Sequence, residues 1–137
     1  MTLQAFELDD LKNRASLACK NAHAPYSRFT VGAAVIDRNA QVFAGCNVEN
    51  ASYGLTMCAE RNAIAAAVAA GVVAGDLQLI LIYTPGNRPA PPCGGCRQVI
   101  HEMMPAEATV VSCCDSAEQM KWSVAQVLPD PFRMEEM

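Results

Sequence analysis

The chain has 137 residues, of which 52% are apolar, and its net charge at pH 7 is −4. This length and composition suit one globular domain without disulfide bonds, and we expect residues 1–137 to form a single domain. The sequence has no basic cluster for nucleic-acid phosphates, no apolar run long enough to cross a membrane, and no secretory signal at its start. We therefore expect a cytoplasmic protein that binds neither nucleic acids nor membranes.

Apolar periodicity and turn residues divide the chain into helices and strands. Helices are expected over residues 7–22, 57–70 and 93–104, strands over 30–38, 41–48, 77–84 and 108–114, and a short strand with a short final helix over 118–129. A first hairpin followed by alternating helices and strands favours helices on both faces of one sheet. The fold class we predict is α/β, a three-layer α/β/α sandwich around a mixed five-stranded sheet.

Three of the seven cysteines stand at the predicted starts of two helices. Cys58 stands at the N-terminus of an alanine-rich helix, and Cys93 and Cys96 form a C-x-x-C pair in the first turn of another. A helix N-terminus favours the thiolate, which is the metal-binding form of cysteine. If the two helices pack side by side, three thiolates converge. The other cysteines are interpreted as small buried apolar residues: Cys19, Cys46, Cys113 and Cys114.

Three thiolates would leave a tetrahedral Zn²⁺ with one open position, which is typical of a catalytic site. Glu60 would lie beside the metal without binding it, where it can take up a proton and pass it on. Because three thiolates outweigh the charge of Zn²⁺, a nearby cation would help, and we assign this role to Arg61. Arg97 fits either this role or a solvated position in the first turn of its helix.

The sequence C-A-E followed by P-C-x-x-C resembles the signature of zinc-dependent nucleobase deaminases, with cysteine in place of histidine as the first ligand. More widely, the chain resembles the small, homotetrameric, zinc-dependent cytidine deaminases. The similar segments follow one another in the order of that family: APYSRFTVGAA at 24–34, GCNVENASYG at 45–54, CAERNAI at 58–64, PCGGCRQVI at 92–100 and LPDPF at 128–132. Asn62, where the family often has Thr, and Pro131 depart from its pattern.

The resemblance implies roles at the matching positions. One Zn²⁺ per subunit would be held by Cys58, Cys93 and Cys96, with Glu60 as proton shuttle. The substrate-binding residues would be Phe29, which stacks on the pyrimidine, Asn47 and Glu49, which hold the ribose hydroxyls, the backbone N–H of Ala59, and Ala51, Tyr53 and Phe132, which reach an active site from neighbouring subunits. Residues Arg61, Arg97 and Gln98 would surround the zinc ligands. A homotetramer with shared active sites is implied.

The activity expected is zinc-dependent hydrolytic deamination of cytidine and 2′-deoxycytidine to uridine and 2′-deoxyuridine, with release of ammonia, as in pyrimidine salvage. A related substrate, such as an N4-substituted cytidine or blasticidin S, is the alternative within the same chemistry. Two alternatives have a different function. A C-x-x-C redox protein would leave Cys58 and Glu60 unexplained, and a non-enzymatic zinc-stabilised module would need four protein ligands. His23 and His101 are interpreted as structural or surface residues, because neither lies at ligand spacing from the cysteines.

Overall fold

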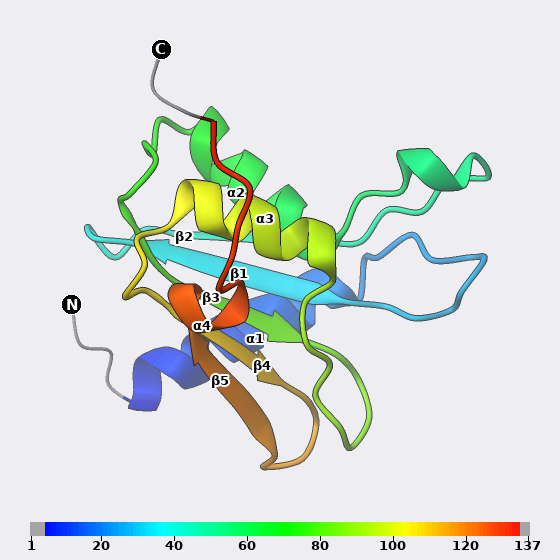
Figure 1. Cartoon of the computed structure of the whole chain (residues 1–137). Helices are drawn as coiled ribbons and strands as arrows, with labels where there is room; N and C mark the ends of the chain where they lie inside the picture. The colour runs from blue at the N-terminus through cyan, green and yellow to red at the C-terminus, as the bar shows by residue number, and fades with distance from the viewer. Residues whose placement is uncertain (1–4, 135–137) are drawn as a thin grey trace.

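The computed structural model describes residues 5–134 and shows one mixed sheet with helices on both faces (Figure 1). Along the chain the elements are α1 (Ala5–Cys19), β1 (Gly32–Asp37), β2 (Val42–Cys46), a 3-10 turn (Tyr53–Leu55), α2 (Ala59–Ala69), β3 (Leu77–Tyr83), α3 (Gly94–Met103), β4 (Thr109–Cys113), β5 (Gln119–Ser123) and α4 (Val124–Val127). The prediction omitted only the 3-10 turn.

The five strands lie in the order β2-β1-β3-β4-β5. The predicted hairpin is present as β1 and β2, which pair from Gly32 opposite Cys46 to Ile36 opposite Val42. Strand β1 is also antiparallel to β3, whereas β3 and β4 run parallel and β4 and β5 form a second antiparallel pair. The carboxyl ends of β3 and β4 therefore meet at one edge of the sheet, so the segments that follow them lie together there.

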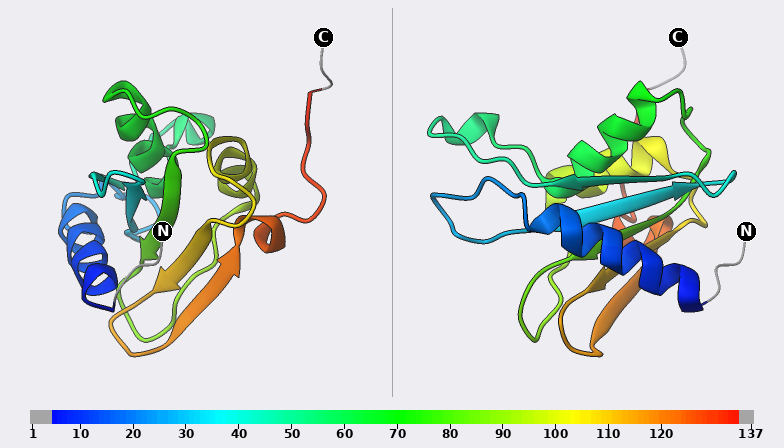
Figure 2. Two further views of the ribbon diagram at one scale, coloured as in Figure 1. Left: turned by 90° about the vertical axis from the view of Figure 1, so that its left-hand side faces the viewer. Right: turned by 180° about the vertical axis from the view of Figure 1, so that it is seen from behind.

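The sheet has a helical layer on each face, as the sequence predicted (Figure 2). Helix α1 covers one face through Leu11 and Ala15, and helices α2 and α3 cover the other. Side chains of β1, β3 and β4 alternate between the two cores: Ala34, Ile36, Leu79, Leu81 and Val111 face α1, and Ala33, Val35, Ile80, Ile82 and Val110 face α2 and α3. The central strand β3 is buried on both faces, which explains its continuous apolar run.

Two glycines allow the helices to approach the sheet closely. A β-carbon at Gly32 would lie 1.8 Å from the carbonyl oxygen of Ala15 in α1. On the other face, a β-carbon at Gly45 would lie 2.5 Å from the backbone nitrogen of Ala63 in α2. The face of α2 that meets the sheet consists of small residues one turn apart, and Ala59, Ala63 and Ala67 are all fully buried. The alanine-rich sequence of α2 thus permits close packing of helix on strand.

The ends of several elements differ from the prediction. Helix α1 stops at Cys19 rather than residue 22, because Asn21 and Ala22 donate to carbonyls three residues back and His23 then donates to Asn47. Strand β2 ends at Cys46 because the side chain of Asn47 turns to bind the segment before β1. These ends depend on contacts between distant segments, which local periodicity does not report.

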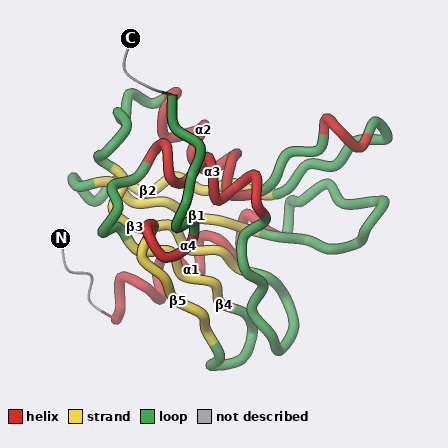
Figure 3. Tube along the Cα trace, in the orientation of Figure 1, coloured by secondary structure: helices red, strands yellow, loops and turns green. Residues whose placement is uncertain are grey.

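Two loops project side by side beyond the end of the sheet, residues 24–31 and 47–57 (Figures 1 and 3). The rings of Tyr26 and Tyr53 join them edge to face, with centroids 6.0 Å apart. The C-terminal tail runs along α3, where Gln98 donates to the carbonyl of Phe132 and accepts from its backbone nitrogen. None of the helices within residues 5–134 has the length and apolar character needed to cross a membrane.

Candidate metal centre and active site

The three predicted cysteine ligands lie at the first turns of α2 and α3, which pack side by side over the sheet (Figure 1). Cys58 is the N-cap of α2 and Cys93 is the N-cap of α3, where its sulfur accepts from the Cys96 backbone nitrogen at 3.4 Å. Cys96, in the first turn of α3, is fully buried, and Cys93 is exposed. Both helix N-termini thus direct their partial positive charge at the three sulfurs.

The spacing of the sulfur atoms fits a zinc ion. The Sγ atoms of Cys58, Cys93 and Cys96 all lie within 4.8 Å of one another, and those of Cys58 and Cys93 are 3.9 Å apart. Zinc bound to thiolates at about 2.3 Å in a tetrahedron requires sulfurs about 3.8 Å apart. A disulfide would bring the two sulfurs to about 2.05 Å. The three cysteines therefore could hold Zn²⁺ with little rearrangement.

The thiols of this cluster already share their protons unequally. A hydrogen bond from Cys96, assisted by the guanidinium of Arg61, lowers the pKa of Cys58 to about 5. The same hydrogen bond and burial raise the pKa of Cys96, because Cys96 acts as the donor. A thiolate at Cys58 is thus favoured by the protein itself, and a divalent cation would favour the loss of the remaining protons.

The two arginines that follow the ligands behave differently. Arg61 donates through Nη2 to the Cys58 sulfur at 3.3 Å and to the Thr56 carbonyl oxygen at 3.3 Å, so its guanidinium lies where negative charge would accumulate. Arg97 instead donates to the carbonyl oxygens of Pro92 and Val127, each at 2.8 Å. The structure therefore places only Arg61 against a thiol and uses Arg97 to tie α3 to α4.

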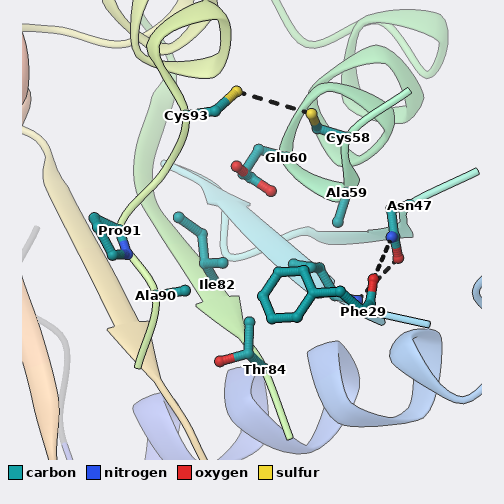
Figure 4. A pocket seen from close by; sticks show the side chains of 11 residues that line it. Phe29, Asn47, Cys58, Ala59, Glu60, Ile82, Thr84, Ala90, Pro91 and Cys93 are labelled. Atoms are coloured by element: carbon teal, nitrogen blue, oxygen red, sulfur yellow. Dashed lines mark hydrogen bonds between the residues drawn. The ribbon is translucent and has the colours of Figure 1, made fainter. Parts of the chain in front are cut away.

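Glu60 lies in a pocket beside the cysteines (Figure 4). Glu60 is only 5% exposed, and this burial raises the pKa of its carboxyl group. The pocket has a volume of about 180 Å³ and is partly open to solvent. Cys58, Cys93 and Glu60 form one end of it, so the carboxyl group and the sulfurs face the same space. A raised proton affinity beside a metal site suits a group that takes up and releases protons.

The rest of the pocket wall comes from several elements. Among the predicted substrate-binding residues, Phe29, Asn47 and Ala59 line it, and the ring of Phe29 is half exposed at its mouth. Sequence reasoning missed the remaining wall residues: Val31, Ile82, Thr84, Ala90 and Pro91. The only sequence signal for the last of these was the proline-rich segment directly before Cys93.

Asn47 holds the segment that carries Phe29. Its side-chain oxygen accepts from the Val31 nitrogen at 2.9 Å, and its side-chain nitrogen donates to the Phe29 carbonyl at 2.8 Å. Both ends of the amide are thus engaged with residues on either side of position 30, and Asn47 itself is 8% exposed. Asn47 therefore positions one wall of the pocket.

Glu49 lies outside this pocket. Its carboxylate accepts from the backbone nitrogens of Tyr26 and Ser27, at 2.9 and 3.1 Å, and from the Ser27 hydroxyl. The hydroxyl bond, followed by these backbone bonds, lowers the pKa of Glu49. With Tyr26, Ser27, Tyr53 and Thr56 it lines a second hollow between the two projecting loops. In one chain, therefore, Asn47 and Glu49 face different cavities.

The three residues expected to serve neighbouring subunits are exposed. Tyr53 and Phe132 are 75% and 69% exposed, and Ala51 lies on the same projecting loop as Tyr53. None of the three lines the pocket described above. Gln98, expected near the zinc ligands, instead makes the two hydrogen bonds that hold the tail at Phe132.

Of the four remaining cysteines, three are buried as predicted: Cys19, Cys113 and Cys114. Cys46 is only partly buried, so the prediction was wrong in degree there, and desolvation raises the pKa of its thiol. His23 pairs with Val48 through its backbone, and His101 accepts from Arg133 at 3.4 Å. Within the part of the chain that the structure describes, neither histidine joins the cysteine cluster.

A family model described as the cytidine and deoxycytidylate deaminase zinc-binding region matches residues 7–113. The chain belongs to the cytidine and deoxycytidylate deaminase family. Cytidine deaminase from Halalkalibacterium halodurans is 42% identical over 127 residues, or 93% of this chain and 95% of that relative. Cytidine deaminase from Sporosarcina psychrophila is 35% identical over 131 residues, or 96% of this chain and 95% of that relative.

Solved structures of deaminases show the same fold. The crystal structure of cytidine deaminase from Burkholderia pseudomallei has a TM-score of 0.87 and 43% sequence identity, and the match covers 90% of this chain and 98% of that one. The predicted family and the predicted α/β sandwich are therefore confirmed. The zinc-binding description of the deaminase family, with the cysteine cluster, also confirms the predicted cofactor and the prediction of an enzyme.

Proposed function

We propose that this protein catalyses the hydrolytic deamination of cytidine and 2′-deoxycytidine to uridine and 2′-deoxyuridine, with release of ammonia. The observation that carries the proposal is the buried carboxyl group of Glu60, which shares one pocket with the sulfurs of Cys58 and Cys93. A zinc site with an adjacent carboxyl group is the arrangement that nucleobase deamination requires. The names of the relatives described above agree with a cytidine-type nucleoside as substrate.

Cys58, Cys93 and Cys96 would hold the zinc ion. Bound there, Zn²⁺ supplies a Lewis acid with one position open to water, which lowers the pKa of that water. Arg61 withdraws charge from the cluster by its hydrogen bond to Cys58, which offsets the excess of the three thiolates. The two helix N-termini act in the same direction.

Glu60 is the proton shuttle of the proposed mechanism. Its carboxylate takes a proton from water as the water oxygen bonds to C4 of the cytosine ring, and it donates that proton to N3. It then moves the proton of the new hydroxyl group to the amino nitrogen, the C4–N4 bond breaks, and ammonia leaves. Burial raises the affinity of Glu60 for a proton, so uptake and release are more nearly balanced than at an exposed carboxylate.

The pocket wall would orient the nucleoside. Phe29 would stack on the pyrimidine from the mouth of the pocket, and the backbone N–H of Ala59, at the start of α2, would donate to the base carbonyl. Asn47 and Glu49 would bind the ribose hydroxyls. For Glu49 this requires the sugar to extend from the pocket toward the hollow between the two projecting loops.

A homotetramer with shared active sites is part of the proposal. The projecting loops and the tail expose apolar side chains that a single chain leaves uncovered, including Tyr26, Tyr53, Leu55 and Phe132. Ala51, Tyr53 and Phe132 would then meet the pocket of a neighbouring subunit. A single domain over residues 1–137 and a cytoplasmic location also stay predictions.

The decisive experiment is a substrate panel of cytidine, 2′-deoxycytidine, N4-methylcytidine and blasticidin S, followed by the pyrimidine absorbance and by ammonia release. We expect turnover of the first two substrates, its loss with a zinc chelator and its return with added zinc. Glu60→Gln should retain metal and fold but lose nearly all turnover, whereas Glu107→Gln, at an exposed carboxylate, should match the wild type. Turnover of N4-methylcytidine or blasticidin S alone would favour the related-substrate alternative, and no turnover of any of the four compounds would contradict the proposed function.

A further inference from the structure

The segment between β3 and α3, residues 84–93, forms one wall of the proposed substrate pocket. It contributes Thr84, Ala90 and Pro91 to the wall and ends at Cys93. Residues 85–88 are exposed, and the segment contains no helix or strand. Something other than its own secondary structure must therefore fix its position.

Arg97 holds one end of the segment, by donating to the Pro92 carbonyl at 2.8 Å, and the turn after β4 is bonded to the other end. The Asp115 carboxylate accepts a hydrogen bond from the Gly86 nitrogen at 2.8 Å and another from the hydroxyl of Tyr83. The Asp115 nitrogen donates to the Gly86 carbonyl at 2.8 Å, so the two residues are joined in both directions. Next to them, the Ser116 hydroxyl donates to the carbonyl of Asn87 at 3.0 Å.

The topology explains why these two segments meet. Strands β3 and β4 are the parallel pair of the sheet, so their carboxyl ends lie at the same edge, and Thr84 donates to the Cys113 carbonyl as the strands part. The segment after β3 and the turn after β4 run side by side in Figure 1 and in the right-hand view of Figure 2. Gly86 has a left-handed φ of 99°, which turns its N–H toward the carboxylate at little steric strain.

We propose that Asp115 is a positioning residue for substrate binding, acting by fixing the segment 84–93 as a wall of the pocket. Asp115 lies outside the five segments that resemble the deaminases and beyond the end of the family match at residue 113. The role rests on the proposed deaminase function, since the pocket is its substrate site. The Asp115 side chain does not touch the pocket itself and acts through Gly86 and Tyr83.

The proposal predicts a separation of KM from kcat. Loss of the Asp115 carboxylate frees the wall formed by Thr84, Ala90 and Pro91. Cys58 and Glu60 are held by α2, and Cys93, at the end of the segment, is held as the N-cap of α3. We therefore expect Asp115→Ala to raise KM for cytidine roughly three- to tenfold and to change kcat less. Asp115→Asn should restore KM, because an amide can accept from Gly86 and donate to the Tyr83 hydroxyl.

Asp37 provides a matched control. Its carboxylate also accepts from two backbone nitrogens, those of Asn39 and Gln41, at 3.0 and 2.8 Å. It is the last residue of β1, before the turn to β2, at the opposite end of the sheet from the pocket. Asp37→Ala should therefore lower the thermal stability without raising KM.

The experiment measures KM, kcat, zinc content and amide hydrogen exchange of residues 84–93 for the wild type, Asp115→Ala, Asp115→Asn and Asp37→Ala. Faster exchange in this segment and a raised KM in Asp115→Ala alone support the proposal. Unchanged exchange in Asp115→Ala, an unchanged KM, or the same rise in Asp37→Ala would overturn it. If the wild type does not turn over cytidine, the proposed function fails separately, and hydrogen exchange still decides whether Asp115 fixes the segment.

Discussion

Gly45 of β2 lies directly against the backbone of Ala63 in α2, with space for a hydrogen atom but not for a methyl group. A β-carbon there would lie 2.5 Å from the Ala63 nitrogen and 2.8 Å from the Ala59 carbonyl oxygen. Both neighbours are backbone atoms of a helix, so they cannot rotate away as a side chain would. Gly45 thus sets the distance between the sheet and the helix whose first turn carries Cys58 and Glu60.

Gly45→Ala should therefore displace α2 and reduce both stability and zinc binding. Overpacking of this kind typically costs about 1–3 kcal/mol. Thermal unfolding and zinc content after dialysis measure the two effects. Gly71→Ala is the control, because Gly71 has a left-handed φ of 102° after the end of α2 and no atom near its missing side chain. It should lose roughly 1–2 kcal/mol of stability and keep its zinc. Equal zinc loss in both variants would contradict the role of Gly45.

Arg61 should matter for zinc affinity more than Arg97 does. The Arg61 guanidinium donates to the Cys58 sulfur, and removing a partner of a metal ligand typically costs about 10- to 100-fold in affinity or activity. We expect this loss in Arg61→Gln, measured by competition with a chromogenic zinc chelator. Arg97→Gln, which loses bonds to Pro92 and Val127, should mainly lower the melting temperature. A larger loss of zinc affinity in Arg97→Gln would reverse the assignment.

Asn47→Asp tests how the segment with Phe29 is held. The carboxylate can still accept from the Val31 nitrogen, but an oxygen replaces the donor to the Phe29 carbonyl. An unpaired buried polar group costs about 1–3 kcal/mol, so stability should fall by that amount. Because Phe29 lines the pocket, KM for cytidine should rise as well. A loss of stability with an unchanged KM would show that this segment does not position the substrate.

The sequence predicted the parts of the site that depend on local structure. Cys58 and Cys93 could be placed at helix starts because these positions depend only on the first turn of each helix. That the two helices pack side by side was a condition of the prediction, and the structure meets it. The same reasoning placed Glu60, which shares a turn with Cys58. To predict these features, only one helix or two adjacent helices must be assigned correctly.

The sequence did not predict contacts between distant segments. One partner of Arg97, Val127, lies in α4, and the partners of Glu49 lie in the loop before β1. The bond between Asp115 and Gly86 joins the segments that follow two parallel strands. Each depends on the order of strands in the sheet, which a single sequence does not encode at short range. The wall residues Ala90 and Pro91 were missed for the same reason.

The bond between Tyr83 and Asp115 should give stability a specific dependence on pH. Hydrogen bonding to Asp115 raises the pKa of Tyr83 to about 12, and the same bond, with that from Gly86, lowers the pKa of Asp115. Lys12 of α1 acts on Asp115 in the same direction. The lowered pKa of Asp115 stabilises the fold above its ordinary value of about 3.9, and this contribution disappears as the pH falls through the folded pKa.

The raised pKa of Tyr83 acts at the other end of the pH range. Its contribution is complete below the ordinary tyrosine pKa of about 10 and is lost as the pH rises toward 12. Tyr83→Phe removes the hydroxyl and should therefore melt at a lower temperature than the wild type between about pH 5 and 9. The difference should begin to shrink below about pH 4, where Asp115 becomes protonated in the unfolded chain, and it should disappear as the pH falls through the lowered pKa of Asp115 in the folded protein. Melting curves across this range measure it, and a difference that stays constant down to pH 3 would show that the hydroxyl stabilises the fold without the Asp115 carboxylate.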